Sequence, residues 1–230
     1  MAKKFEMAGS KALVVILAAV LILGGIVGST MAWLMAETDD VVNTFTYGDI
    51  NIDLEETDTE LDEDDDPNTN EFEMIPGQEI EKDPTVTVLK DSENAWVFVK
   101  LVESENFDEF LTYGMAEGWA ALLDAEGNAV EGVYYRYQGE SAEDVEIEVL
   151  NGNKVIVRPE VTKEMLNALN AGDTENYPTL TVTAYAVQYA GFEAKNAETG
   201  EITHEPTQAE NDAAALNAWN TVVMADVTNP

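Results

Sequence analysis

The residues that could perform catalysis begin with a single histidine, His204, which stands directly before Glu205 and Pro206. The common zinc peptidase motif needs two histidines one helical turn apart, with a glutamate between them. The chain has one histidine in total, so the motif fails and His204 is interpreted as a solvated residue ahead of the last helix. Ser141 lies in Gly-Glu-Ser-Ala-Glu, which lacks the second glycine of a nucleophile elbow. Cysteine is absent, so thiol chemistry is excluded, and we predict no catalytic residue.

Carboxylates are abundant, and many of them gather in one run. Ten of the fourteen residues from Asp53 to Asp66 are acidic, and this composition favours a solvated loop over residues 53–71. Calcium takes several carboxylate oxygens, so Asp62, Asp64 and Asp66 are candidate ligands. The run lacks the spacing and the glycine of an EF-hand loop, however, and diffuse condensation of cations is favoured over a specific site. We therefore expect no cofactor beyond weakly bound Ca²⁺.

Net charge restricts the classes of partner. The 230 residues carry a formal charge of −35, and the first 32 carry +2, so the remainder carries −37. Phosphate recognition needs clustered Lys and Arg, so nucleic acid is excluded as a partner, and anionic lipid surfaces are disfavoured for the same reason. The charge also opposes stacking of identical subunits unless salt, divalent cations or acid reduces the repulsion.

The first 32 residues have the three parts of a secretory signal peptide. A lysine-containing start is followed by the apolar stretch Ala12 to Leu23, then by glycines, a serine and Thr-Met-Ala. This pattern predicts cleavage between Ala32 and Trp33, with a second candidate after Ala36. The alternative is a retained anchor, because residues 12–36 contain no charge and about twenty apolar residues suffice to span a bilayer. With cleavage, residues 33–230 form one exported domain, and contact with the membrane is limited to the leader.

The elements of this domain are mostly strands. Residues 44–54 alternate, with Ile50, Ile52 and Leu54 on one face, which is the period of a half-buried strand. The runs 85–89 and 95–102 are rich in β-forming residues and flank a polar turn. Glu126-Gly127-Asn128 and Asn151-Gly152-Asn153 each predict a hairpin turn. About eight strands at short spacing predict an all-β sandwich or barrel, and the stretch around residues 180–188 is predicted to be the longest strand.

Two short helices complete the prediction. The first follows Thr162, a candidate cap, and stops near Gly172. The second begins with the capping-box pair Thr207 and Glu210. Its buried face is predicted to contain Ala213, Leu216 and either Ala218 or Trp219.

Several separated stretches together resemble the TasA/camelysin family. They are Ala32-Trp33 at the cleavage point, Asn43-Thr44-Phe45-Thr46-Tyr47-Gly48, Pro76-Gly77 with Lys82-Asp83-Pro84 after it, and Ala186-Val187-Gln188. The leader resembles those cut by the dedicated signal peptidase SipW. The resemblance implies a jelly-roll-like β-sandwich and an exported biofilm-matrix or cell-surface protein that polymerises into fibres, alone or with related matrix subunits. Camelysin members also carry a metallopeptidase label, which the residues described above do not support.

The resemblance further implies that the mature N-terminal segment of one subunit completes the sheet of the next. An apolar terminus too short to fold alone is a liability in water, and it must pack on its own domain or on a neighbour. Strand addition would supply backbone hydrogen bonds for affinity and alternate side chains for specificity. Trp33, Leu34 and Val41 are the predicted anchors of this segment. The alternatives are self-packing in a monomer, a surface metallopeptidase, and an uncleaved membrane-anchored binding domain.

Overall fold

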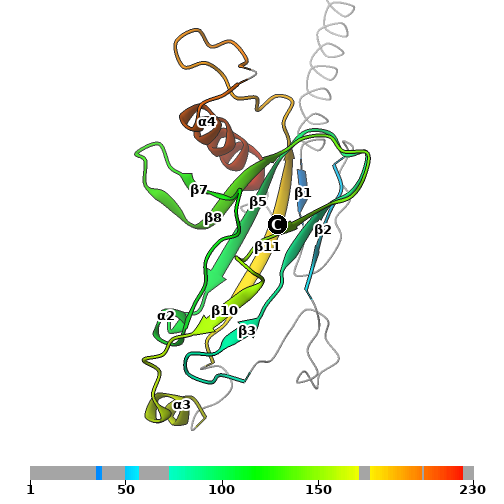
Figure 1. The fold of residues 1–230 in the computed structure, drawn as a ribbon. Helices are drawn as coiled ribbons and strands as arrows, with labels where there is room; N and C mark the ends of the chain where they lie inside the picture. Colours follow the sequence, from blue (N-terminus) through cyan, green and yellow to red (C-terminus); the bar gives the residue numbers. More distant parts are fainter. Residues whose placement is uncertain (1–34, 38–49, 57–72, 171–176, 204, 225–230) are drawn as a thin grey trace, which may run out of the picture.

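The computed structural model describes residues 35–37, 50–56, 73–170, 177–203 and 205–224. These residues form the predicted all-β sandwich, with antiparallel sheets and a few short helices (Figure 1). The larger layer is a five-stranded sheet. Its strands, in spatial order, are β1 (Met35–Glu37), β11 (Leu180–Gln188), β5 (Ala95–Glu103), β8 (Ala129–Gln138) and β7 (Ala120–Leu123).

The facing layer consists of two three-stranded sheets that are the halves of one bent ribbon. β3 leads into β4 and β9 leads into β10, and Glu81 pairs with Lys154 on one side of the bend while Thr85 pairs with Glu148 on the other. The two sheets have the orders β2 (Ile52–Glu55), β4 (Thr85–Val88), β9 (Val145–Glu148) and β3 (Glu79–Glu81), β10 (Lys154–Val157), β6 (Leu111–Thr112).

The main core lies between these two layers. Leu180, Val182 and Ala184 project from β11 into it, at every second position of the strand. Ile50, Ile52 and Leu54 are buried in the same core, which confirms their predicted inward orientation. Residues 44–49 of that predicted strand lie outside the described residues, and β2 itself begins at Ile52.

A second core covers the opposite face of the five-stranded sheet, beneath α4 (Gln208–Ala218) and a π-helical turn, η2 (Trp219–Val223). The predicted helix face is wrong at Ala213, which is exposed, whereas Leu216 is half-buried against this core and both Ala218 and Trp219 are buried as predicted. Small alanines at adjacent positions let α4 lie close to the sheet, and η2 turns its larger side chains inward. The buried residues of α4 and η2 are Ala214, Ala215, Ala218, Trp219, Val222 and Val223.

The helix starts agree with the sequence. Thr162 Oγ1 accepts a hydrogen bond from the Met165 backbone N–H at 3.3 Å ahead of α3 (Lys163–Asn170). Thr207 and Glu210 form the complete capping box at α4. Gly172, the predicted stop of the first helix, lies outside the described residues. A further one-turn helix, α2 (Phe107–Phe110), was not predicted, and it buries the phenylalanine at each end.

One predicted hairpin is confirmed and the other is wrong. β7 and β8 pair across Gly127, whose φ of +85° suits a tight turn. Gly152 and Asn153 also have positive φ, but β9 and β10 do not pair with each other. This turn instead carries the chain across the bend in the ribbon. Local turn chemistry therefore fixed the backbone angles, while pairing was decided by distant strands.

The strand count and the longest strand also differ from the prediction. The described residues contain eleven strands rather than about eight, because β1, β3 and β6 span only two or three residues and show no alternation in sequence. β8 has ten residues and is longer than β11, which has nine. β8 contains a bulge near Gly132, where the pairing with β7 shifts register.

Candidate assembly edge

The segment that follows the predicted leader forms an edge strand. Met35, Ala36 and Glu37 pair antiparallel with Val187, Ala186 and Tyr185 of β11. β11 pairs with β5 along its whole length, so β1 lies at the outer border of the five-stranded sheet (Figure 1). In the described part of the chain, no further strand pairs with β1. Three residues of the candidate donor segment thus pair with a strand of their own domain.

The residues predicted to mark cleavage and to anchor the segment lie outside the described residues. These are Ala32, Trp33, Leu34 and Val41. Their roles remain predictions, as does the choice between cleavage after Ala32 and after Ala36.

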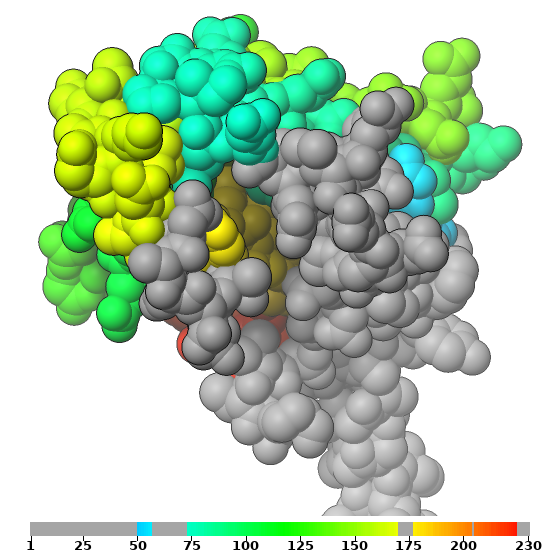
Figure 2. All heavy atoms as spheres, turned by 90° about the horizontal axis from the view of Figure 1, so that it is seen from below, coloured from blue at the N-terminus to red at the C-terminus, as the bar shows by residue number. Residues whose placement is uncertain are grey.

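Partly exposed apolar side chains lie at the open border of the main core. Leu180 and Val182 of β11 are half-buried, as are Met165 and Leu166 of α3 and the nearby Tyr177. Figure 2 shows this region from below, with the β11 part of the chain at the back of a hollow between the stretch that includes α3 and the stretch that includes β3. The sandwich therefore presents apolar surface next to β11, the strand that β1 borders.

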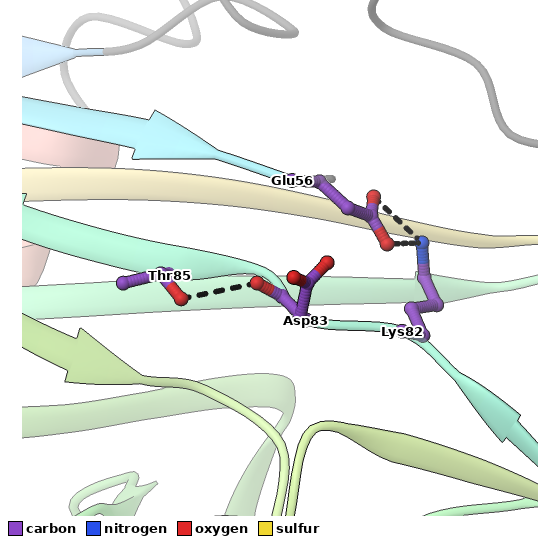
Figure 3. Close-up of polar contacts among 4 residues, drawn as sticks. All are labelled: Glu56, Lys82, Asp83 and Thr85. Atoms are coloured by element: carbon purple, nitrogen blue, oxygen red, sulfur yellow. Dashed lines mark hydrogen bonds and ion pairs between the residues drawn. The ribbon is translucent and has the colours of Figure 1, made fainter. Parts of the chain in front are cut away.

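An ion pair fixes the start of the acidic run to the bend in the ribbon (Figure 3). Lys82 Nζ donates to Glu56 Oε1 at 2.7 Å and to Oε2 at 2.9 Å, and the side chains are only 13% and 19% exposed. The Lys82 backbone N–H donates to the Asn153 carbonyl at 3.0 Å, and Thr85 Oγ1 donates to the Asp83 carbonyl at 3.0 Å. Sequence reasoning singled out Lys82-Asp83-Pro84 but missed this partner, because Glu56 is one of many acids in its run.

A polar network holds α4 on the outer face of the sheet. Tyr135 Oη donates to Asp212 Oδ1 at 2.5 Å and accepts from Gln208 Nε2 at 2.9 Å. Burial of the ring, followed by the hydrogen bond to Asp212, raises the pKa of Tyr135 well above its usual range. Gln208 and Asp212 stand four residues apart on one face of the helix. That spacing was the sequence signal for this network, and it was not recognised.

The remaining candidates for chemistry are local or lie outside the described residues. Ser141 Oγ donates to the Glu143 carbonyl and accepts from the Glu143 N–H, so it belongs to a local turn. Asp62, Asp64, Asp66 and His204 lie outside the described residues. Among the residues that the structure does describe, no three His, Cys, Asp or Glu side chains are grouped to hold a metal ion.

Comparisons with protein-family models, with curated proteins and with solved structures found no match. In the described ranges, no helix has the length and apolar character needed to cross a membrane.

Proposed function

We propose that this chain is an exported structural protein of the TasA/camelysin type, which assembles by adding the segment after its leader to a sheet edge of a neighbouring copy. The product would be a fibre of the extracellular matrix or cell surface. The observation that supports the proposal is the position of β1, which forms the border of the larger sheet immediately after the predicted cleavage region.

Edge strands offer unpaired backbone groups, which makes them natural sites for pairing between chains. In the described part of the chain, β1 pairs with β11 through three residues, and no further strand pairs with its outer edge. A head-to-tail contact between two different surfaces of identical subunits produces a filament when the rotation does not close a ring. The charge on the exported part explains why such assembly would need screening or protonation.

The test uses protein that begins at Trp33, examined by light scattering and negative-stain microscopy over a range of salt, Ca²⁺ and pH. The variant Leu34→Asp/Val41→Asp places two charges in the donor segment and is expected to abolish filaments. Ile202→Asp is the matched control, because Ile202 is an exposed apolar residue, 52% accessible, far from this edge in sequence. Filaments from the double variant that equal those of the wild type would refute the proposal.

The mass and N-terminal sequence of the native extracellular protein test the export step. A start at Trp33 supports cleavage after Ala32, whereas an uncut chain in the membrane fraction would favour an anchored domain. Metal analysis, with peptidase assays in the presence and absence of chelator, tests the alternative of a surface metallopeptidase.

A further inference from the structure

Arg136 of β8 lies against Trp119 and Gly118, which precede β7. Its guanidinium carbon lies 5.7 Å from the centre of the Trp119 ring, and the Trp119 Nε1–H donates to the Glu148 carbonyl at 2.8 Å, which fixes the ring. Gly118 has a φ of +92°, and a Cβ there would lie 3.2 Å from Arg136 Nη1. Gly118 and Trp119 thus form a tight cradle for the guanidinium.

Among the residues that the structure describes, the guanidinium has no anionic partner. The three ion pairs among the described residues involve Lys82, Lys154 and Arg158. Arg136 Nε is buried and has no hydrogen-bond partner. Burial lowers the pKa of the Arg136 guanidinium, yet arginine stays charged in proteins. A partly desolvated cation without a counter-charge is costly, and it is unexpected in a chain with 46 acidic and 11 basic residues.

β8 extends past the end of its ladder with β7 at Arg136. β8 pairs with β5 through residues 136–138, but its pairing with β7 ends at Tyr135. In the described part of the chain, nothing pairs with residues 136–138 on the β7 side. Tyr137, the next residue, is 45% exposed. Unpaired backbone, an exposed ring and an unmatched cation therefore occur at one place.

We propose that this edge of β8, with Arg136, receives the N-terminal segment of a second copy of the chain, whose carboxylates pair with the guanidinium. The inference rests on the proposed assembly and names its acceptor. The segment contains Glu37, Asp39 and Asp40, and a carboxylate matches the fork of a guanidinium with two parallel hydrogen bonds.

The two surfaces lie at opposite sides of the same sheet. β1 forms one border beyond β11, and the open stretch of β8 lies towards the other border, beyond β5. β1 keeps its pairing with its own β11 and offers its outer edge to β8 of the next copy. The contact is head-to-tail, and it continues the five-stranded sheet from one subunit to the next.

The test compares Arg136→Glu and Arg136→Gln with Arg158→Glu, in protein that begins at Trp33, under conditions in which the wild type forms filaments. Arg158 is the matched control because its ion pair with Asp108 is exposed. Each Arg136 variant should raise the critical concentration for assembly at least ~10-fold, whereas Arg158→Glu should leave it unchanged. Adding Glu37→Lys/Asp39→Lys/Asp40→Lys to Arg136→Glu should restore assembly. Circular dichroism and thermal midpoints of the monomers establish that each variant is folded, and Arg136→Gln serves if Arg136→Glu does not fold.

The outcomes separate this inference from the proposed function. A wild type that forms no filaments under any condition overturns the proposed assembly itself. If the wild type assembles and folded Arg136 variants assemble equally well, the β8 acceptor is wrong. If Arg136→Glu impairs assembly and the triple lysine change does not restore it, the N-terminal segment is not the source of the carboxylate, and the inference also fails.

Discussion

Replacing Gly132 with alanine tests the close approach of β8 to β5. Gly132 has a φ of +67°, and a Cβ built there would lie 2.0 Å from the Leu101 carbonyl oxygen. Carbon–oxygen contacts in sheets are normally about 3.3–3.6 Å, so the two strands would have to separate by more than ~1 Å. The left-handed backbone alone costs an alanine about 1–2 kcal/mol. The strand displacement adds to this, and we expect a total loss of about 3–5 kcal/mol in the free energy of unfolding.

Gly127→Ala is the matched control for this prediction. Gly127 has a φ of +85°, but no atom lies within 4 Å of its added Cβ. Both substitutions stabilise the protein by about 0.4–1 kcal/mol because alanine lowers the conformational entropy of the unfolded chain, and both carry the cost of the left-handed backbone. The free energy of unfolding of the control should therefore fall by no more than about 1.5 kcal/mol. Urea unfolding followed by tryptophan fluorescence measures the difference, provided that the slope of the free energy of unfolding against urea concentration is the same in all variants. A Gly132→Ala variant within about 0.5 kcal/mol of Gly127→Ala would refute the argument, since it would show that the bulge relaxes freely.

Three further predictions concern the polar contacts. Lys82→Met should lower the free energy of unfolding by about 1–3 kcal/mol, because it leaves Glu56 mostly buried and without this cation. Lys154→Met is the control: its ion pair is more exposed, with side chains 34% and 60% accessible, and it should change the free energy of unfolding by less than about 0.5 kcal/mol in the same urea assay. Burial raises the pKa of the Tyr135 hydroxyl from its ordinary value of 10.0, so the protonated hydroxyl stabilises the folded state fully below pH 10, and this stabilisation is lost as the pH rises towards the folded pKa. Tyr135→Phe should therefore lose less stability than the wild type as the pH is raised above 10, measured by circular dichroism. The hydrogen bond from the Asn128 backbone N–H lowers the pKa of Asp124 from 3.8, so the ionised carboxylate stabilises the folded state above that pH, and this stabilisation is lost as the pH falls through the folded pKa. Asp124→Ala should therefore lose less stability in acid than the wild type does. An equal loss would contradict this assignment.

The parts of the fold that follow from local chemistry could be predicted from the sequence. Gly127 and the Asp124 side chain, which accepts from the Asn128 N–H at 2.8 Å, fix a turn within five residues, so the β7–β8 hairpin was foreseeable. The capping box at Thr207 is equally local. The turn at Gly152 has the same signal but a different result, because the strands that pair with β9 and β10 come from residues 79–88. Pairing between strands so far apart in the chain cannot be recognised from a short stretch of sequence.

The second core illustrates a signal that was present but underused. Along β11, Ala184 and Ala186 face one way while Tyr185 and Val187 face the other, and all four are buried. Apolar residues on both faces of one strand indicate a sheet covered on both sides. The predicted sandwich assigned no element to cover that second face. α4 supplies the cover, and this is why its alanines, rather than a regular stripe of large residues, turn inward.

The candidate site was predictable only in part, and the reason is electrostatic. Among 46 acidic residues no single carboxylate is informative, so the partner of Lys82 could not be chosen from sequence. The few basic residues are more informative, because each could pair with many carboxylates and the fold shows which partner, if any, it takes. Arg136 lies against an aromatic ring and a glycine, and no carboxylate of the described residues pairs with it, which is a property of the folded surface alone.

The same charge explains why the proposed assembly should depend on ionic strength. Residues 33–230 carry −37, so two copies repel each other over the screening distance, which is about 10 Å at 0.1 M salt and about 30 Å at 0.01 M. A short β-edge contact with one matched cation cannot overcome that repulsion in dilute salt. Higher ionic strength shortens the range of the repulsion, while a partly buried carboxylate–guanidinium pair is screened much less. Filament formation by this chain should therefore increase as salt is raised from 0.01 M to 0.1 M. A decrease over that range would mean that attraction between charges, and not pairing at the sheet edge, holds the subunits together.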